Sequence, residues 1–202
     1  MDNNKKISDW KYILLDTSFI IDYLSNPEKF DKNPQKQKNI LLAKAIMKEL
    51  SLKKGENKPH FYVTSITIGE LIKLETASIV KKIVEIFYSG DVTILSYGKN
   101  EAEELNKFAI SWKKAKSPNK SLKDIEQAKK ESGCINYRAW INDDMKILSC
   151  AKRLYDKRLL DIILTSDEKT FFSIAEYWEL PCRVLNDKYF PKDLFGELDT
   201  EQ

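Results

Sequence analysis

Short runs of consecutive apolar residues alternate along the chain with longer segments in which apolar residues recur every three or four positions. The first run, Lys11–Leu15, contains YILL with no polar residue inside it. Such a run is typical of a strand that helices cover on both faces. Four comparable runs follow, at residues 61–63, 92–95, 160–164 and 183–185. Strands alternating with helical segments predict an α/β fold, with a central, mainly parallel sheet and helices on both faces.

Helices are expected between these strands. Asn39–Lys53 has close to helical periodicity, and Gly55 is expected to end that helix. Asn26 precedes a proline and is expected to end the helix before it, while Asn33 and Pro34 are expected to form a turn. The other expected helices cover residues 18–25, 67–75, 78–88, 101–112, 144–155 and 170–178.

The 202 residues are enough for one domain with a sizeable core, and no break in composition suggests a second. We expect an N-terminal tail at 1–10, one domain at 11–190 and a C-terminal tail at 191–202. The start of the chain has no apolar signal-peptide region, and no run approaches a membrane span. Three cysteines without a C-x-x-C pair indicate a reducing, cytoplasmic location.

Four acidic residues stand where predicted strands end or predicted helices begin: Asp16, Glu70, Asp144 and Asp167. In a parallel α/β sheet these positions share one edge, which is where such folds bind ligands. Four carboxylates that converge there need a cation, and Mg²⁺ or Mn²⁺ prefers such oxygen ligands. The pattern therefore indicates a metal-dependent enzyme.

Each acid also has a purely structural interpretation. Asp16, or Ser18 beside it, suits the N-cap of the following helix. Glu70 completes a T-x-x-E capping box in which it would accept a bond from the Thr67 backbone N–H. An acid at position 144 suits the positive end of a helix that Asn142 would cap, and Asp167 suits a local side-chain turn.

In order and local context, the four acids resemble those of the PIN-domain ribonucleases, including the VapC-type toxins. The matching segments are ILLDTSFIID (13–22), VTSITIGEL (63–71), DMKILSCA (144–151) and ILTSDEKTF (163–171). The resemblance covers about residues 11–185 and implies a PIN-like fold. Compared with a compact VapC toxin, the chain has extra helical segments at about 26–60 and 112–142. Asp143 is an alternative third acid, but Asp144 places Ile147 where the family has an apolar residue.

The resemblance implies hydrolysis of RNA phosphodiester bonds that depends on Mg²⁺ or Mn²⁺ and leaves a 5′-phosphate and a 3′-hydroxyl. Asp16 and Asp144 would hold the metal, Glu70 would bind it or orient the attacking water, and Asp167 would complete the acidic pocket. It also implies RNA as the partner, an antitoxin-like protein inhibitor and a homodimer. Hydroxyl groups that would support the carboxylates belong to Thr17, Ser18, Thr165 and Ser166.

Two other functions are open: a catalytically idle scaffold that binds RNA or protein, and a metal-dependent phosphoesterase that acts on DNA or a small ester. The net charge of +3 excludes a simple polycation. Residues 107–131 hold eight lysines against three acidic residues, a local net charge of +5 next to Phe108 and Trp112. This segment suits either RNA backbone binding or a solvated helical face. The single histidine, His60, provides no zinc site.

Overall fold

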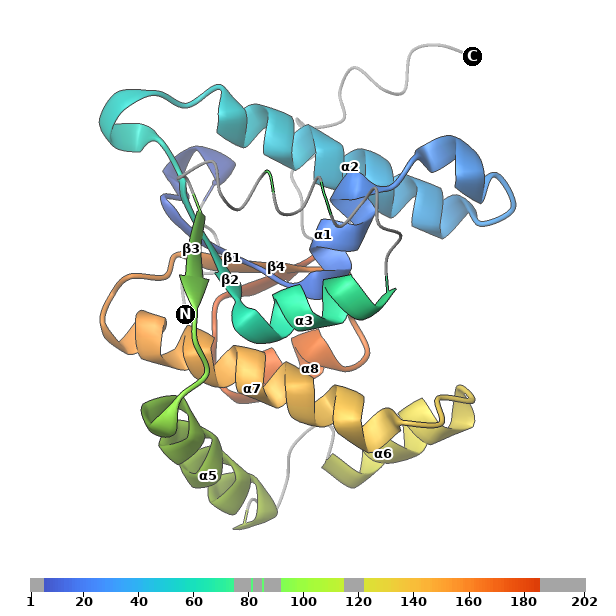
Figure 1. The fold of residues 1–202 in the computed structure, drawn as a ribbon, viewed down its shortest axis with the longest axis vertical. Coiled ribbons are helices and arrows are strands. Elements are labelled where there is room, and N and C mark those ends of the chain that lie inside the picture. Colours follow the sequence, from blue (N-terminus) through green and yellow to red (C-terminus); the bar gives the residue numbers. More distant parts are fainter. Residues whose placement is uncertain (1–5, 75–80, 82–84, 86–91, 115–121, 186–202) are drawn as a thin grey trace.

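The computed structural model describes residues 6–74, 81, 85, 92–114 and 122–185. They contain a five-stranded parallel sheet in the order β3-β2-β1-β4-β5 (Figure 1). The predicted α/β class with helices on both faces is confirmed, and the arrangement is consistent with a PIN-like fold. The strands are β1 (Tyr12–Leu15), β2 (His60–Thr64), β3 (Val92–Leu95), β4 (Ile162–Thr165) and β5 (Cys182–Val184).

Seven α-helices and three short 3₁₀ helices are present in the described ranges. The 3₁₀ helices are η1 (Ile7–Asp9), η2 (Pro27–Phe30) and η3 (Gly55–Asn57). The α-helices are α1 (Thr17–Leu24), α2 (Pro34–Ser51), α3 (Ser65–Leu74), α5 (Lys99–Lys114), α6 (Leu122–Glu131), α7 (Tyr137–Asp156) and α8 (Phe171–Tyr177).

Alternate residues of each strand enter two separate hydrophobic cores, because successive side chains of a strand point to opposite faces. Ile13 and Leu15 pack with α1 and α2 in the first core. Leu14, between them, packs with α7 and α8 in the second. Figure 1 shows α1 and α2 on one side of the sheet and α5, α7 and α8 on the other. Burial on both faces explains why β1 and β4 are almost continuously apolar.

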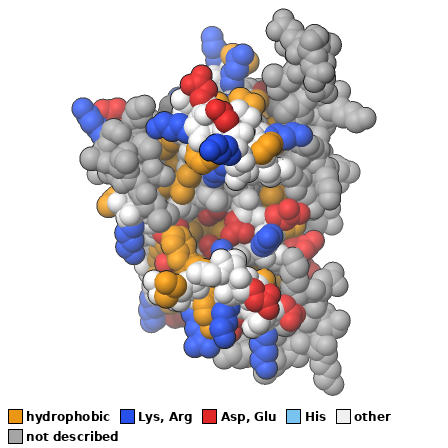
Figure 2. All heavy atoms as spheres, turned by 90° about the vertical axis from the view of Figure 1, so that its right-hand side faces the viewer, with side chains coloured by type: hydrophobic (Ala, Val, Ile, Leu, Met, Phe, Trp, Pro, Cys, Tyr) orange, Lys and Arg blue, Asp and Glu red, His pale blue; other side chains and the backbone are white. Residues whose placement is uncertain are grey.

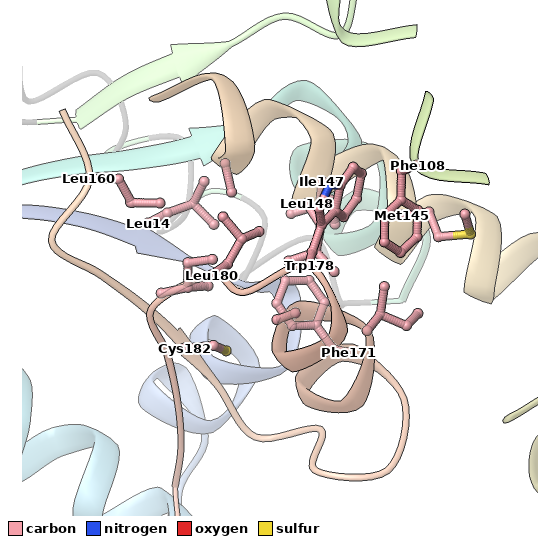
Figure 3. Close-up of a cluster of buried hydrophobic side chains, with 14 of the residues drawn as sticks. Leu14, Phe108, Met145, Ile147, Leu148, Leu160, Phe171, Trp178, Leu180 and Cys182 are labelled. Carbon is pink, nitrogen blue, oxygen red and sulfur yellow. The ribbon is translucent and has the colours of Figure 1, made fainter. Parts of the chain in front are cut away.

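The second core joins helices that are distant in the sequence (Figure 3). Phe108 of α5 stacks on Trp178 at the end of α8, with ring centroids 3.8 Å apart. Met145 and Leu148 of α7 and Phe171 of α8 are buried in the same cluster. This packing fixes α7 across the sheet, and α7 carries Asp144.

The boundaries of two helices differ from expectation. Asn33 and Pro34 do not form a free turn: the Asn33 side chain accepts a bond from the Lys36 backbone N–H at 3.1 Å, and α2 begins at Pro34. Proline is favoured in the first turn, where its missing N–H needs no partner. The same helix ends at Ser51, before Gly55, which has a φ of +63° and opens η3.

Helix α7 begins at Tyr137, seven residues before the expected start at Asp144. Its apolar stripe extends backwards through Ile141, which is buried with Met145, so the helix continues past the acidic pair. The extra segment expected at 112–142 therefore includes α6 and the start of α7. Of the helix expected at 78–88, only residues 81 and 85 are described. The C-terminal tail expected at 191–202 lies outside the described residues.

Part of the expected N-terminal tail packs against the domain. Trp10 is 2% exposed and packs with Ile7 in the first core. The Lys53 ammonium donates to the carbonyl oxygens of Ile7 and Trp10 at 2.6 and 2.9 Å. Residues 7–10 therefore belong to the domain.

The helices in the described part of the chain include none with the length and apolar character of a membrane span.

Candidate active site

Three neighbouring strands place three of the acids at the carboxyl edge of the sheet. Asp16 follows β1 directly, Glu70 lies in the second turn of the helix that follows β2, and Asp167 lies two residues after β4. Asp144 reaches the same edge from α7, which packs against α3 and α8. On the face drawn in Figure 2, several acidic side chains lie across the middle, and others lie near the top and the lower right among Lys and Arg side chains.

Asp16 is held by hydroxyl groups from two strand ends. Its Oδ2 accepts from Ser18 Oγ at 2.5 Å, Thr165 Oγ1 at 2.8 Å and the Ser18 backbone N–H at 3.3 Å. The capping role is therefore real, and the bond from Thr165 adds a link from β4. Burial raises the pKa of Asp16, against the lowering effect of these bonds. All three of these bonds are made to Oδ2, and the Thr17 backbone also acts to lower the pKa of this carboxylate.

Glu70 does not form the expected capping box. Helix α3 begins at Ser65, and the Thr67 backbone N–H donates to Thr64 Oγ1 at 3.0 Å instead. The Glu70 carboxylate accepts a short bond from Thr17 Oγ1, which ties α3 to the start of α1. Burial raises the pKa of Glu70 to about 7, because it outweighs the Thr17 bond and the Asp16 charge acts in the same direction.

Asp144 lies about two turns inside α7, so the helix-start interpretation is wrong for this residue. Its Oδ2 is buried, and no hydrogen-bond donor among the described residues reaches it. Burial raises the pKa of Asp144 well above its ordinary value, and the charges of Asp16 and Asp167 add to the effect. Asp143 instead pairs with Lys146 at 2.7 Å. Asp144 is therefore the member of the acidic pair that belongs to the cluster.

Asp167 has a partner on each carboxylate oxygen. Its Oδ1 accepts from the Thr170 backbone N–H at 2.8 Å, and its Oδ2 from Lys129 Nζ at 3.2 Å. The interpretation of Asp167 as the acceptor in a local side-chain turn is therefore confirmed. Burial lowers the pKa of the Lys129 ammonium, but the Asp167 and Asp144 carboxylates raise it above its ordinary value. The sequence pattern indicated Lys129 only as one lysine of the segment 107–131.

A second residue that sequence reasoning missed is Asp22, which is fully buried. Ser166 Oγ donates to its Oδ2 at 2.6 Å, and the Lys36 ammonium pairs with Oδ1. The Ser18 hydroxyl accepts from the Ser166 backbone N–H at 2.8 Å, so one loop is tied to α1 twice. An acid inside the apolar segment FIIDYL, one helical turn after Ser18, was the available signal.

A groove of about 610 Å³ opens beside Asp167. Polar side chains predominate around it, and it runs between α1, α2, the loop after β4 and the end of β5. The lining residues are Ser18, Asp22, Gln35, Lys36, Asn39, Ser166, Asp167, Glu168, Lys169, Val184 and Leu185. It provides room for an extended polar substrate next to the acids.

The donor set fits a hard divalent cation in charge and in atom type. Asp16, Glu70 and Asp144 offer carboxylate oxygens, and the buried Oδ2 of Asp144 has the unmet need that a cation would satisfy. Their pKa values are all raised, as expected where like charges are buried together. Within the described residues no three acidic side chains are already at metal-ligand spacing. Binding would therefore need rotations of these carboxylates.

Comparison with known proteins adds no relative. No protein-family model matches the chain. No curated protein matches it either. The interpretation of this site accordingly depends on the sequence motifs, the parallel sheet and the contacts described above.

Proposed function

We propose that this protein is a PIN-like ribonuclease that hydrolyses RNA phosphodiester bonds with the help of Mg²⁺ or Mn²⁺. The observation that carries the proposal is the convergence of Asp16, Glu70 and Asp144, in which the buried Oδ2 of Asp144 has no donor within the described residues. Four ordered motifs and the parallel sheet support it. Free thiols at Cys134, Cys150 and Cys182 agree with action in the cytoplasm.

In this proposal Asp16 and Asp144 hold the metal. When bound, such an ion would acidify a water molecule and offset charge on the phosphate oxygens. Glu70 accepts the proton of the attacking water, because a pKa of about 7 suits a general base near neutral pH. Thr17 keeps the Glu70 carboxylate in reach, and the hydroxyls of Ser18 and Thr165 fix the rotamer of Asp16.

The groove beside Asp167 is the proposed path of the RNA strand. Asn39 and Lys169 line it, and amide and ammonium groups suit contacts with sugars and phosphates, whereas the Lys36 ammonium is paired with Asp22. The lysine-rich run at 107–131 lies partly outside the described residues. Within the described part, Lys107 pairs with Glu104 on α5, whereas Lys129 faces the acids. The groove is the first candidate for substrate contact among the described residues.

The family resemblance extends the proposal to a VapC-type toxin that forms a homodimer and is held by an antitoxin-like inhibitor. Controlled expression tests the first part: growth arrest in cells that make the wild-type chain, and none with Asp144→Asn, is expected. Sedimentation of the purified chain tests the homodimer.

A catalytically idle scaffold is the second candidate, because the acids are not already at metal-ligand spacing. In that case Asp16 would simply cap α1, and Asp167 would cap the turn before α8. The groove would then bind RNA or a protein segment without cleavage.

One assay separates these functions. The full chain is incubated with Mn²⁺ or Mg²⁺ and a mixed pool of structured and single-stranded RNAs, with a DNA pool in parallel. We expect cleavage of RNA that falls at least about 100-fold in Asp16→Asn and Asp144→Asn. Asp156→Asn, at the exposed end of the same helix, is the matched control and should cleave normally. Metal-dependent cleavage of DNA alone would assign a different phosphoesterase, and binding of RNA without cleavage would favour the scaffold.

A further inference from the structure

We propose that Lys129 is a built-in cation of this site, which occupies Asp167 and leaves room for one divalent ion, at Asp16 and Asp144. The inference deepens the proposed function and rests on it. In this arrangement α6, part of the extra length of the chain, completes the site from outside the four motifs. Lys129 then also faces the phosphate during cleavage.

The position of Lys129 is set by the packing of α6. Ile125, one helical turn earlier on the same face, is 2% exposed and is buried in the second core. Helix α6 packs along α7, which carries Asp144. The ammonium of Lys129 lies 3.2 Å from Asp167 Oδ2, and the two side chains are 25% and 26% exposed. A lysine held this way buries its apolar stem and keeps its charge at the rim of the site.

Asp167 is poorly available as a direct metal ligand. Thr170 and Lys129 engage its two oxygens, at 2.8 and 3.2 Å. A divalent ion on the same carboxylate would face the ammonium at close range, and like charges at such distances repel strongly in a partly buried site. The buried oxygen of Asp144 has no hydrogen-bond donor in the described part of the chain, although the Lys129 charge acts on this carboxylate as well.

The charges also match a single divalent ion. Asp16, Asp144 and Asp167 carry three negative charges when ionised, and Lys129 with one divalent ion carries three positive ones. A second divalent ion would have to bind at the Asp167 oxygen that the Lys129 ammonium already occupies.

The test is Mn²⁺ binding to the full chain, measured by calorimetry and by the loss of the free Mn²⁺ resonance signal, without RNA. Lys129→Met removes the charge but keeps the apolar stem. We expect wild type to bind one Mn²⁺ that Asp144→Asn abolishes, and Lys129→Met to bind Mn²⁺ about tenfold more tightly, because a repelling charge is gone. Lys129→Arg restores the charge and should restore wild-type affinity. Lys130→Met, on the exposed neighbour, should change nothing.

If Lys129→Met binds Mn²⁺ no more tightly than wild type, the ammonium is not part of the ion's surroundings and the inference is overturned. Two Mn²⁺ ions per wild-type chain at the acids would overturn it equally. Should the Met variant fail to fold, Lys129→Gln carries the same expectation. Failure of the proposed function gives a different result. If Mn²⁺ binds to wild type and the variants as expected but RNA is not cleaved, the ribonuclease is rejected and Lys129 is kept as the built-in cation. If Mn²⁺ does not bind, both proposals are rejected.

Discussion

Asp144 is a residue of this site whose ionised side chain lowers the stability of the fold. A carboxylate whose buried oxygen has no donor among the described residues, placed near Asp16 and Asp167, is unfavourable for folding unless it is protonated or bound to a cation. A purely structural position would accept a neutral residue more readily. Local rules that fail in this way are concentrated at functional sites, and this conflict is the strongest reason to look for chemistry here.

Glu70 predicts how the stability of the metal-free protein depends on pH. Its pKa is raised from 4.5 to about 7, so the folded state holds a proton that the unfolded state releases at lower pH. The stabilisation by that proton is complete below about pH 4.5 and is lost as the pH rises through about 7. Burial of the charged form then costs about 2–3 kcal/mol relative to the protonated form. The free energy of unfolding in EDTA should therefore fall between about pH 5 and pH 8.

Urea unfolding across this pH range checks the prediction. Glu70→Gln should flatten the part of the slope that belongs to Glu70, while Glu56→Gln, an exposed acid in η3, should keep the wild-type slope. Asp16 and Asp144 have pKa values shifted in the same direction, so some slope should persist in Glu70→Gln. An unchanged slope in that variant would show that Glu70 is ionised in the folded protein near pH 5.

Among the elements, the strands and their parallel pairing could be predicted from the sequence, most clearly for β1 and β4, which are almost continuously apolar because both of their faces are buried. The order of the strands in the sheet was not predicted. The start of α7 could not be predicted, since Asn142, Asp143 and Asp144 resemble a helix N-terminus. The buried Ile141 shows that the apolar stripe runs through them. The polar residues stand in mid-helix because one of them faces the site.

Some residues of the candidate site could likewise be predicted from the sequence, and others could not. Acids next to strand ends could be placed from sequence because the carboxyl edge of a parallel sheet gathers them. Lys129 could not, because its place depends on how α6 packs against α7. Asp22 could not either, because its partners Lys36 and Ser166 come from α2 and from the loop after β4. Contacts between elements that are remote in the sequence leave no local pattern.

Thr165 forms hydrogen bonds with both Asp16 and Asp167, so its replacement should lower both the stability of the protein and its affinity for Mn²⁺. Its Oγ1 donates to Asp16 Oδ2 at 2.8 Å and accepts from the Asp167 backbone N–H at 3.0 Å. Thr165→Val keeps the shape but removes both bonds at a fully buried position, which should cost about 1–3 kcal/mol of unfolding free energy. It should also weaken Mn²⁺ binding, because Asp16 loses a fixed partner. Urea unfolding and calorimetry measure the two effects. Thr93→Val, on an exposed position of β3, should leave Mn²⁺ affinity intact.

At the scale of the whole molecule, the charge distribution argues for a local substrate contact and against general attraction of RNA. The net charge is only +3, so the molecule as a whole attracts RNA weakly. Buried acids on the site face oppose the RNA backbone until cations offset them. Any affinity must therefore come from a few lysines at defined places, and the groove provides Lys169, while the Lys36 ammonium is paired with Asp22.

Lys169 gives the test of that view, because it lines the groove without belonging to the acid cluster. In an Asp144→Asn background, which prevents cleavage, Lys169→Gln should lower the affinity for single-stranded RNA about two- to fivefold at low salt. One lost phosphate contact should also reduce the slope of log affinity against log salt by about 0.7. Lys48→Gln, on an exposed position of α2 outside the groove, should alter neither quantity. Fluorescence anisotropy over a salt series measures both. Equal losses in the two variants would mean that RNA senses only the net charge, and the groove would then lose its role as the substrate path.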